Sequence, residues 1–243
     1  MRIGVICEGP SDFPAIANFV GHIVGAANPG LHFLALYPEM DKTRPEGGWA
    51  NVLLWLKNNP YQTRVQRYFA GGFFGGSLSV EPLDAIILHL DADIVDDDGF
   101  RKFVKARYAL DVTTDGEPTD RAMQVCQVLM MASEFSEMTD ADQRRHLLAP
   151  AVEATETWCL AAFHAQSENF ELLRGTDLIN AFMSALERSE GRDPQQNYAK
   201  VDKSLSRRSR FCERHAAGAS RIVASCEHFA ALIQKLEDVK VGF

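Results

Sequence analysis

The chain has 243 residues, of which 46% are hydrophobic and 24% are charged, and its formal net charge is −8. This composition is typical of a globular protein with one large domain, or one domain with a smaller addition. The negative charge argues against a general nucleic-acid-binding protein, and no apolar run approaches the roughly 20 residues that span a bilayer. Five cysteines without close pairing predict reduced thiols, and strand-like first residues predict no signal peptide. We therefore expect a cytoplasmic protein without a membrane segment.

The first part of the chain alternates between predicted strands and helices. Residues 2–7 are mostly apolar and run into Glu8-Gly9-Pro10-Ser11-Asp12, which is typical of a buried parallel strand that turns into a helix. The next predicted elements are a strand at 31–37, a helix at 49–58, an edge strand at 64–70 and a flexible loop at 71–76.

The middle of the chain contains the clearest buried strand, at 84–90, which ends in Asp91-Ala92-Asp93. After it we expect a solvated acidic loop at 96–98, helices at 100–108 and 118–136, a short strand at 147–152 and only helices thereafter. This order predicts an α/β core at 1–160, with an insertion near 60–82. It also predicts a helical extension at 161–243 that packs on the core.

Acidic residues directly follow two of the predicted strands. Glu8 follows the first strand, and Asp91 and Asp93 follow the central one, so one edge of a parallel sheet would bring all three together. Asp12 could face the same edge, although capping of the following helix explains it equally well. Two carboxylates about 4 Å apart repel by about 4 kcal/mol at an effective dielectric near 20, so the cluster needs a cation or a bound proton. Oxygen ligands without His or Cys favour Mg²⁺ or Mn²⁺.

These motifs also carry a resemblance. The Glu8-Gly9-Pro10-Ser11-Asp12 and Asp91-Ala92-Asp93 stretches resemble the two acidic motifs of the TOPRIM domain, the fold shared by topoisomerases, primases and OLD-type nucleases of bacterial defence systems. Residues 150–158, with Glu156-x-Trp158, and the later Tyr198-x-Lys200 resemble a family of small bacterial TOPRIM-like proteins, a domain of unknown function.

The resemblance implies a Rossmann-like, mostly parallel sheet flanked by helices, and a nuclease that acts beside an ATPase partner. It implies that Glu8 is a general base or metal ligand, that Asp91 and Asp93 are metal ligands, that Asp12 is an auxiliary ligand and that Glu156 completes the site. For Glu156 the alternative is a place in the first turn of a helix capped by Thr155.

A basic segment lies near the C-terminal end. Residues 198–221 contain 7 basic and 2 acidic residues, whereas residues 81–156 contain 17 acidic and 7 basic ones. On a single helix, six of the basic residues would fall within an arc of about 80°. They are Lys200, Lys203, Arg207, Arg210, Arg214 and Arg221. We expect this stripe to contact a nucleic-acid backbone, the alternative being a solvated helix face that Gly218 interrupts.

The predicted function is a divalent-metal-dependent nuclease, or a related phosphoryl-transfer enzyme, acting on DNA or RNA. A second hypothesis is a non-catalytic signalling or binding module built like a phosphoacceptor receiver, which also places acids after its first and third strands. A receiver needs a lysine after a later strand, and no lysine ends a clear strand in this sequence. A third hypothesis is an inactive TOPRIM-like subunit of a defence complex.

Overall fold

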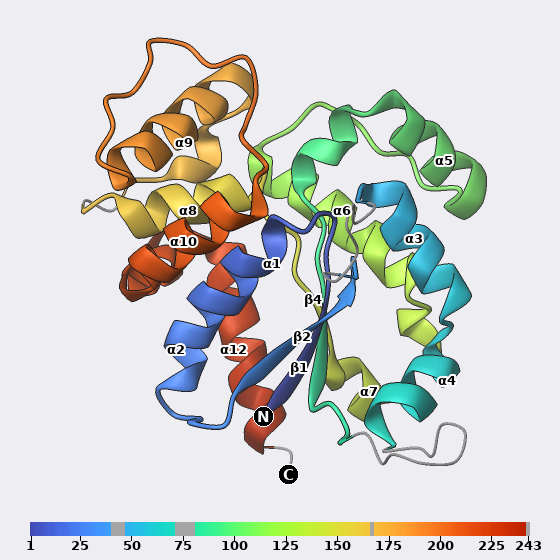
Figure 1. Ribbon diagram of the computed structural model, residues 1–243. Helices are drawn as coiled ribbons and strands as arrows, with labels where there is room; N and C mark the ends of the chain where they lie inside the picture. Colours follow the sequence, from blue (N-terminus) through green and yellow to red (C-terminus); the bar gives the residue numbers. More distant parts are fainter. Residues whose placement is uncertain (40–46, 71–80, 166–167, 242–243) are drawn as a thin grey trace.

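A computed structural model describes residues 1–39, 47–70, 81–165 and 168–241 (Figure 1). Its strands are β1 (Arg2–Ile6), β2 (His32–Tyr37), β3 (Ala85–Leu88) and β4 (His146–Leu148). The α-helices are α1 (Asp12–Ala15), α2 (Gly21–Gly25), α3 (Trp49–Asn58), α4 (Tyr61–Arg64), α5 (Asp98–Tyr108), α6 (Pro118–Ala132), α7 (Asp140–Arg145), α8 (Thr155–Phe163), α9 (Gly175–Ser189), α10 (Leu205–His215), α11 (Ala219–Ser225) and α12 (Glu227–Val241). The π-helical turns are η1 (Ile16–Val20) and η2 (Val65–Phe69), and the 3₁₀ turns are η3 (Ala92–Asp96), η4 (Phe135–Glu137), η5 (Phe170–Leu172) and η6 (Ala216–Gly218).

All four strands of the described sheet are parallel and lie in the order β2-β1-β3-β4. The chain leaves β1 towards β2 on one side and returns to β3 on the other, so the strand order reverses between β1 and β3. In open parallel sheets the carboxyl ends beside such a reversal form a crevice, because the two connections diverge there. The fold therefore places a crevice next to Glu8 and Asp91.

Helices cover both faces of the sheet, which confirms the predicted α/β class with a parallel sheet (Figure 1). Along β1, Ile3 and Val5 pack against α1, α2 and the C-terminal helices, whereas Ile6 packs against α3, α5 and α6. In β3, Ile87 packs into the first of these two layers and Ile86 into the second. This alternation of buried residues on both faces explains the continuous apolar sequence of these strands.

One local prediction was wrong, and another was right only in part. The segment predicted as an edge strand at 64–70 is helical, in α4 and η2. Val65 and Phe69 are four residues apart and pack into the same core layer, and buried Arg64 donates to the carbonyls of Asn59 and Ser133 at 2.5 Å each. The acidic 96–98 stretch is exposed to solvent as predicted, but it is not a loop, since Asp97 accepts from the amides of Gly99 and Phe100 and caps α5. The loop predicted at 71–76 lies outside the described residues.

The C-terminal helices share their hydrophobic core with the sheet. The predicted division at residue 160 falls inside α8, and α12 packs against α2 and β4. Phe229 of α12 is fully buried and its ring lies 5.0 Å from that of Trp158 in α8, centroid to centroid. Within the described ranges, no helix is both long and apolar enough to cross a membrane.

Because this core is shared, we expect Phe229→Ala to destabilise the whole protein by about 3–5 kcal/mol, the usual cost of removing a buried phenyl ring. Met123→Ala is the control, since Met123 is 56% exposed on α6 and its loss leaves no cavity. Urea unfolding followed by circular dichroism and tryptophan fluorescence should give one coincident transition for each variant. Separate transitions would show that the C-terminal helices fold independently.

Candidate functional site

The backbone fixes the predicted acidic residues at the carboxyl edge of the sheet. Glu8 lies two residues beyond β1, and Asp91 pairs with Ala151 in a parallel bridge that extends the β3–β4 pairing. The amide of Asp93 donates to the carbonyl of Glu153 at 3.0 Å. The fold thus places these residues at one sheet edge, although their side chains do not converge on one point among the described residues.

Two cavities meet at this edge. The smaller one, of about 240 Å³, is lined by residues 8–12, Gly47, Gly48, Asp91 and Lys203. The larger one, of about 890 Å³, is lined among others by Asp93 and Glu156. Asp91 and Lys203 belong to the walls of both cavities, so the two openings adjoin. A ligand in either cavity would contact carboxylates and the Lys203 ammonium, and Lys200 also lines the larger cavity.

Glu8 has an unusual environment for a carboxylate. Its Oε2 atom is buried and has no hydrogen-bond partner among the described residues. Burial raises the pKa of Glu8 to about 9, and the neighbouring Asp91, Asp12 and Asp93 charges add to this rise while Lys203 opposes it. Without a bound cation, Glu8 therefore holds a proton at neutral pH. The adjoining loop is close: Gly48 donates its amide to the Glu8 carbonyl at 2.8 Å, and a Cβ on Gly47 would lie 2.9 Å from the same oxygen.

Asp91 is oriented through one of its two oxygens. The Nε2 atom of buried His89 lies 3.2 Å from Asp91 Oδ1, and the Thr155 amide donates to the same oxygen at 3.1 Å. The other ring nitrogen of His89 lies 2.7 Å from the Ala149 carbonyl, which fixes the ring between two strands. Burial lowers the pKa of His89, but the hydrogen bond and charge of Asp91 outweigh burial and raise it overall. Asp91 Oδ2 has no partner within the described part of the chain, so it is available to a ligand.

Asp12 and Glu156, by contrast, use their carboxylates to hold the structure together. Asp12 Oδ2 accepts from the Gly9 amide at 2.7 Å, and Oδ1 accepts from the Thr155 hydroxyl at 3.0 Å. Burial, followed by the Asp91 charge, raises the pKa of Asp12 to about 6. Glu156 forms a buried ion pair with Arg208 of α10. These interactions tie the β1 loop to α8 and α8 to α10.

Asp93 and Lys203 face the larger cavity. Asp93 is exposed to solvent on one side. Desolvation of its carboxylate by the surrounding protein, followed by the charges of Asp91 and Glu156, raises its pKa. The pKa of Lys203 is also raised, because four carboxylates, led by Glu156, outweigh its burial. The Lys203 ammonium has no hydrogen-bond or ion-pair partner among the residues that the structure describes.

The predicted basic stripe does not exist as a single helical face. Helix α10 begins only at Leu205, so Lys200 and Lys203 lie before it and line the acidic cavity. The 3₁₀ turn at 216–218 separates Arg221 from α10. The Arg221 guanidinium instead donates to the carbonyls of Ala161 and Ala162. Arg207 forms ion pairs with three acids, whereas Arg210 and Arg214 of the same helix have no acidic partner in the described ranges.

Sequence reasoning missed three residues that shape this site: His89, Thr155 and Arg208. A signal existed for His89, since residues two apart in a strand share a face, and His89 precedes Asp91 by two. Arg208 gave no such signal, because its partner lies 52 positions away in the sequence.

The donor set suits a hard cation, but the side chains are not gathered around one point. Across the described ranges, no three His, Cys, Asp or Glu side chains are arranged to hold a metal ion. The unused oxygens are those of Glu8, Asp93 and one of Asp91, all of the type that Mg²⁺ and Mn²⁺ prefer. Comparison with protein-family models, curated proteins and solved structures gives no match for this chain.

The raised pKa of Glu8 predicts a pH-dependent stability. Between about pH 4.5 and 9 the folded protein keeps a proton on Glu8 that the unfolded chain releases, so the free energy of unfolding falls as the pH rises through this window. In Glu8→Gln the side chain is neutral at every pH, so this variant should not show the fall in the free energy of unfolding that Glu8 causes. In EDTA, we expect its melting temperature to rise relative to the unmodified protein between about pH 5 and pH 8. Exposed Glu237→Gln is the control, and parallel pH profiles for all three proteins would contradict the assignment.

Proposed function

We propose that the carboxyl edge of the sheet binds Mg²⁺ or Mn²⁺ and that the protein is a metal-dependent nuclease or a related phosphoryl-transfer enzyme. The observation that carries the proposal is the buried, unpartnered Oε2 of Glu8 beside the unpartnered Oδ2 of Asp91. A buried acceptor without a donor costs free energy, and carboxylates that crowd together need a cation or a proton. A divalent cation would satisfy both requirements.

Glu8, Asp91 and Asp93 are the residues we propose as ligands. Their side chains do not converge in the present arrangement, so binding requires Glu8 and Asp93 to rotate towards Asp91. Asp12 and Glu156 would support the three ligands without binding the cation themselves, because their oxygens already bind Thr155 and Arg208. When bound, a divalent cation polarises a phosphate and lowers the pKa of a coordinated water.

The remaining residues of the site have separate tasks in this proposal. His89 orients Asp91 from the interior, since it contacts the carboxylate and a carbonyl of the next strand. Lys203 is the one positive group lining both cavities among the described residues, and its ammonium would contact a phosphate oxygen of the substrate. The size of the larger cavity suits part of a nucleic-acid strand, for which an ATPase partner could control access.

A receiver-like phosphoacceptor module is the second candidate. The strand order 2-1-3-4 matches the start of the 2-1-3-4-5 order found in such doubly wound proteins, and Lys203 supplies an amine near Asp91. A receiver would bind beryllofluoride at one aspartate without cleaving a polymer. An inactive subunit of a complex would bind metal and substrate but leave the substrate intact.

Metal binding should displace protons from the site. We expect Mn²⁺ to raise the melting temperature and to release protons at neutral pH, because ligation requires ionised carboxylates. Calorimetric titrations in buffers of different ionisation enthalpy would measure the release. Glu8→Gln and Asp91→Asn should lose both effects, whereas Asp12→Asn should reduce stability but retain them. An exposed control, Asp111→Asn, should match the unmodified protein, and equal responses in all variants would contradict this site.

Catalysis is tested by the same substitutions. With Mn²⁺ or Mg²⁺ we expect cleavage of DNA or RNA that Glu8→Gln, Asp91→Asn or Asp93→Asn each reduces by about 100-fold or more, since each loses a group placed at the reacting phosphate. Circular dichroism would confirm that the variants stay folded. Activity that is unchanged by all three substitutions, or absent with every divalent cation and with a co-purified ATPase partner, would overturn the proposal.

A further inference from the structure

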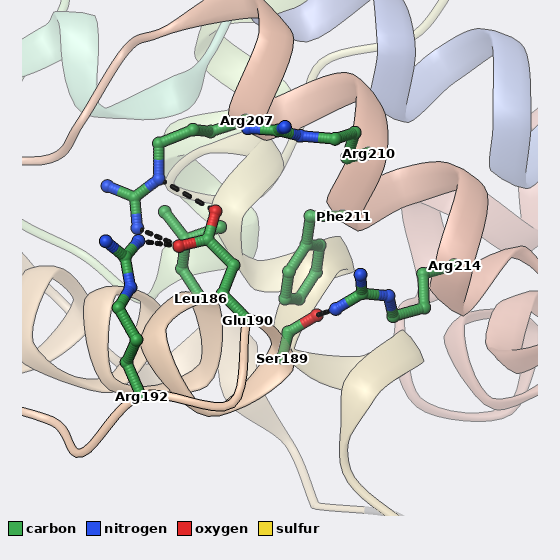
Figure 2. A pocket seen from close by; sticks show the side chains of 8 residues that line it. All are labelled: Leu186, Ser189, Glu190, Arg192, Arg207, Arg210, Phe211 and Arg214. Carbon is green, nitrogen blue, oxygen red and sulfur yellow. Dashed lines mark hydrogen bonds and ion pairs between the residues drawn. The ribbon is translucent and has the colours of Figure 1, made fainter.

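A third cavity, of about 530 Å³, lies between α9 and α10, away from the carboxyl edge, and is lined mainly by arginine (Figure 2). We define the arginine pocket by its charged and hydroxyl-bearing residues, which are Ser189, Glu190, Arg192, Arg207, Arg210 and Arg214. Buried Leu186 and Phe211 complete its wall. Its volume falls within the range of about 300–1,000 Å³ typical of small-molecule sites.

Half of the positive charge in the arginine pocket is already compensated. Arg207 binds Glu190 through two hydrogen bonds of 2.9 and 2.6 Å, and Arg192 binds the same carboxylate (Figure 2). Outside the pocket wall, Glu187 and Asp202 complete the network around these two guanidinium groups. Arg192 and Arg207 are therefore held rigidly, with little charge left for a ligand.

The other half of the positive charge in the arginine pocket is not compensated. Arg210 and Arg214 are exposed, and neither has an acidic partner in the described ranges. Arg214 donates only to the neutral hydroxyl of Ser189, at 3.3 Å. Ser189 in turn lies 2.8 Å from Nε2 of His215, and burial, followed by the charge of Arg214, lowers the pKa of that histidine. The neighbouring histidine thus avoids a positive charge, which is expected beside a surplus of cations.

We propose that the arginine pocket binds the phosphate group of a phosphate monoester. Arg210 and Arg214 are four residues apart on α10, so their side chains lie on one face of the helix. Two guanidinium forks match a tetrahedral dianion in both charge and geometry, better than they match a single carboxylate. Ser189 orients the Arg214 guanidinium by accepting a hydrogen bond from it, and Phe211 offers an apolar surface next to the phosphate. The ligand is either a free nucleotide or the terminal phosphate of a nucleic acid.

Binding measurements in EDTA would test this site apart from the carboxyl edge. The probes are a nucleoside monophosphate, a 5′-phosphorylated oligonucleotide and the same oligonucleotide without its phosphate. We expect the phosphorylated forms to bind, and Arg210→Gln/Arg214→Gln to weaken them by at least about tenfold, because two charge-assisted contacts are lost. Arg210→Lys/Arg214→Lys keeps the charge but not the fork, so its affinity should lie between those of the unmodified protein and of Arg210→Gln/Arg214→Gln. Binding of the oligonucleotide alone would identify the source as a nucleic-acid terminus, and binding of the nucleoside monophosphate would identify a free nucleotide.

The matched control is Arg188→Gln/Lys57→Gln, which removes two exposed positive charges outside the pocket. Equal affinity in this control and in Arg210→Gln/Arg214→Gln would overturn the proposal. So would equal binding with and without the 5′-phosphate, or equally tight binding of polyglutamate, which would indicate an acidic protein as the partner. Glu8→Gln should leave phosphate binding unchanged. Failure of metal binding at the sheet edge and failure of phosphate binding here would therefore appear in different variants.

Discussion

Glu8, Asp12 and Asp91 are held together at the carboxyl ends of two adjacent strands, where the charge of Asp91 makes ionisation of Glu8 and Asp12 less favourable. Burial and this mutual repulsion raise the pKa of both Glu8 and Asp12. Such a cluster persists only if its surroundings supply protons, donors or positive charge. Much of the remaining structure can be understood as the means by which the protein supplies them.

The C-terminal helices contribute most of this compensation. Arg208 comes from α10 and neutralises Glu156, and Lys203 comes from the segment before α10. Both residues lie far along the chain from the strands they serve. The helical part is consequently needed for the electrostatics of the site as well as for the hydrophobic core that it shares with the sheet. Breaking a buried ion pair by removing one partner typically costs about 3–5 kcal/mol, so the two parts depend on each other.

The sequence allowed the parallel sheet and the placement of Glu8, Asp91 and Asp93 to be predicted, because those depend on local pattern. Apolar runs that end in acidic residues identify strands and their carboxyl ends without any knowledge of distant contacts. The helix at 49–58 was predictable for the same reason. The helix at 61–69 was not, since its position depends on Arg64 reaching Ser133, a contact between segments far apart in sequence.

The basic residues also show that distant contacts limit what can be predicted from the sequence. Regular spacing predicted one helical stripe, but a helix start at Leu205 and a turn at 216–218 divided it among four environments. Lys203 lies at the acidic edge, Arg207 belongs to an ion-pair network, and Arg221 contacts the carbonyls of α8. Arg210 and Arg214 line the arginine pocket without an acidic partner in the described ranges. Spacing predicts a face only while the helix continues, and the capping that decides where it ends depends on tertiary contacts.

The two sides of the carboxyl edge differ in how firmly they are held. Beyond β3, the amides of Ala92 and Asp93 continue the pairing with the segment after β4, so this side should exchange its amide hydrogens slowly. Beyond β1, the carbonyl of Glu8 accepts one backbone hydrogen bond from the described part of the neighbouring loop, donated by the amide of Gly48. Ligand binding would therefore cost conformational entropy mainly on the Glu8 side. Selectivity between cations of different radius would then be set by how far the backbone beyond β1 can move Glu8, while the backbone that carries Asp91 and Asp93 stays in place.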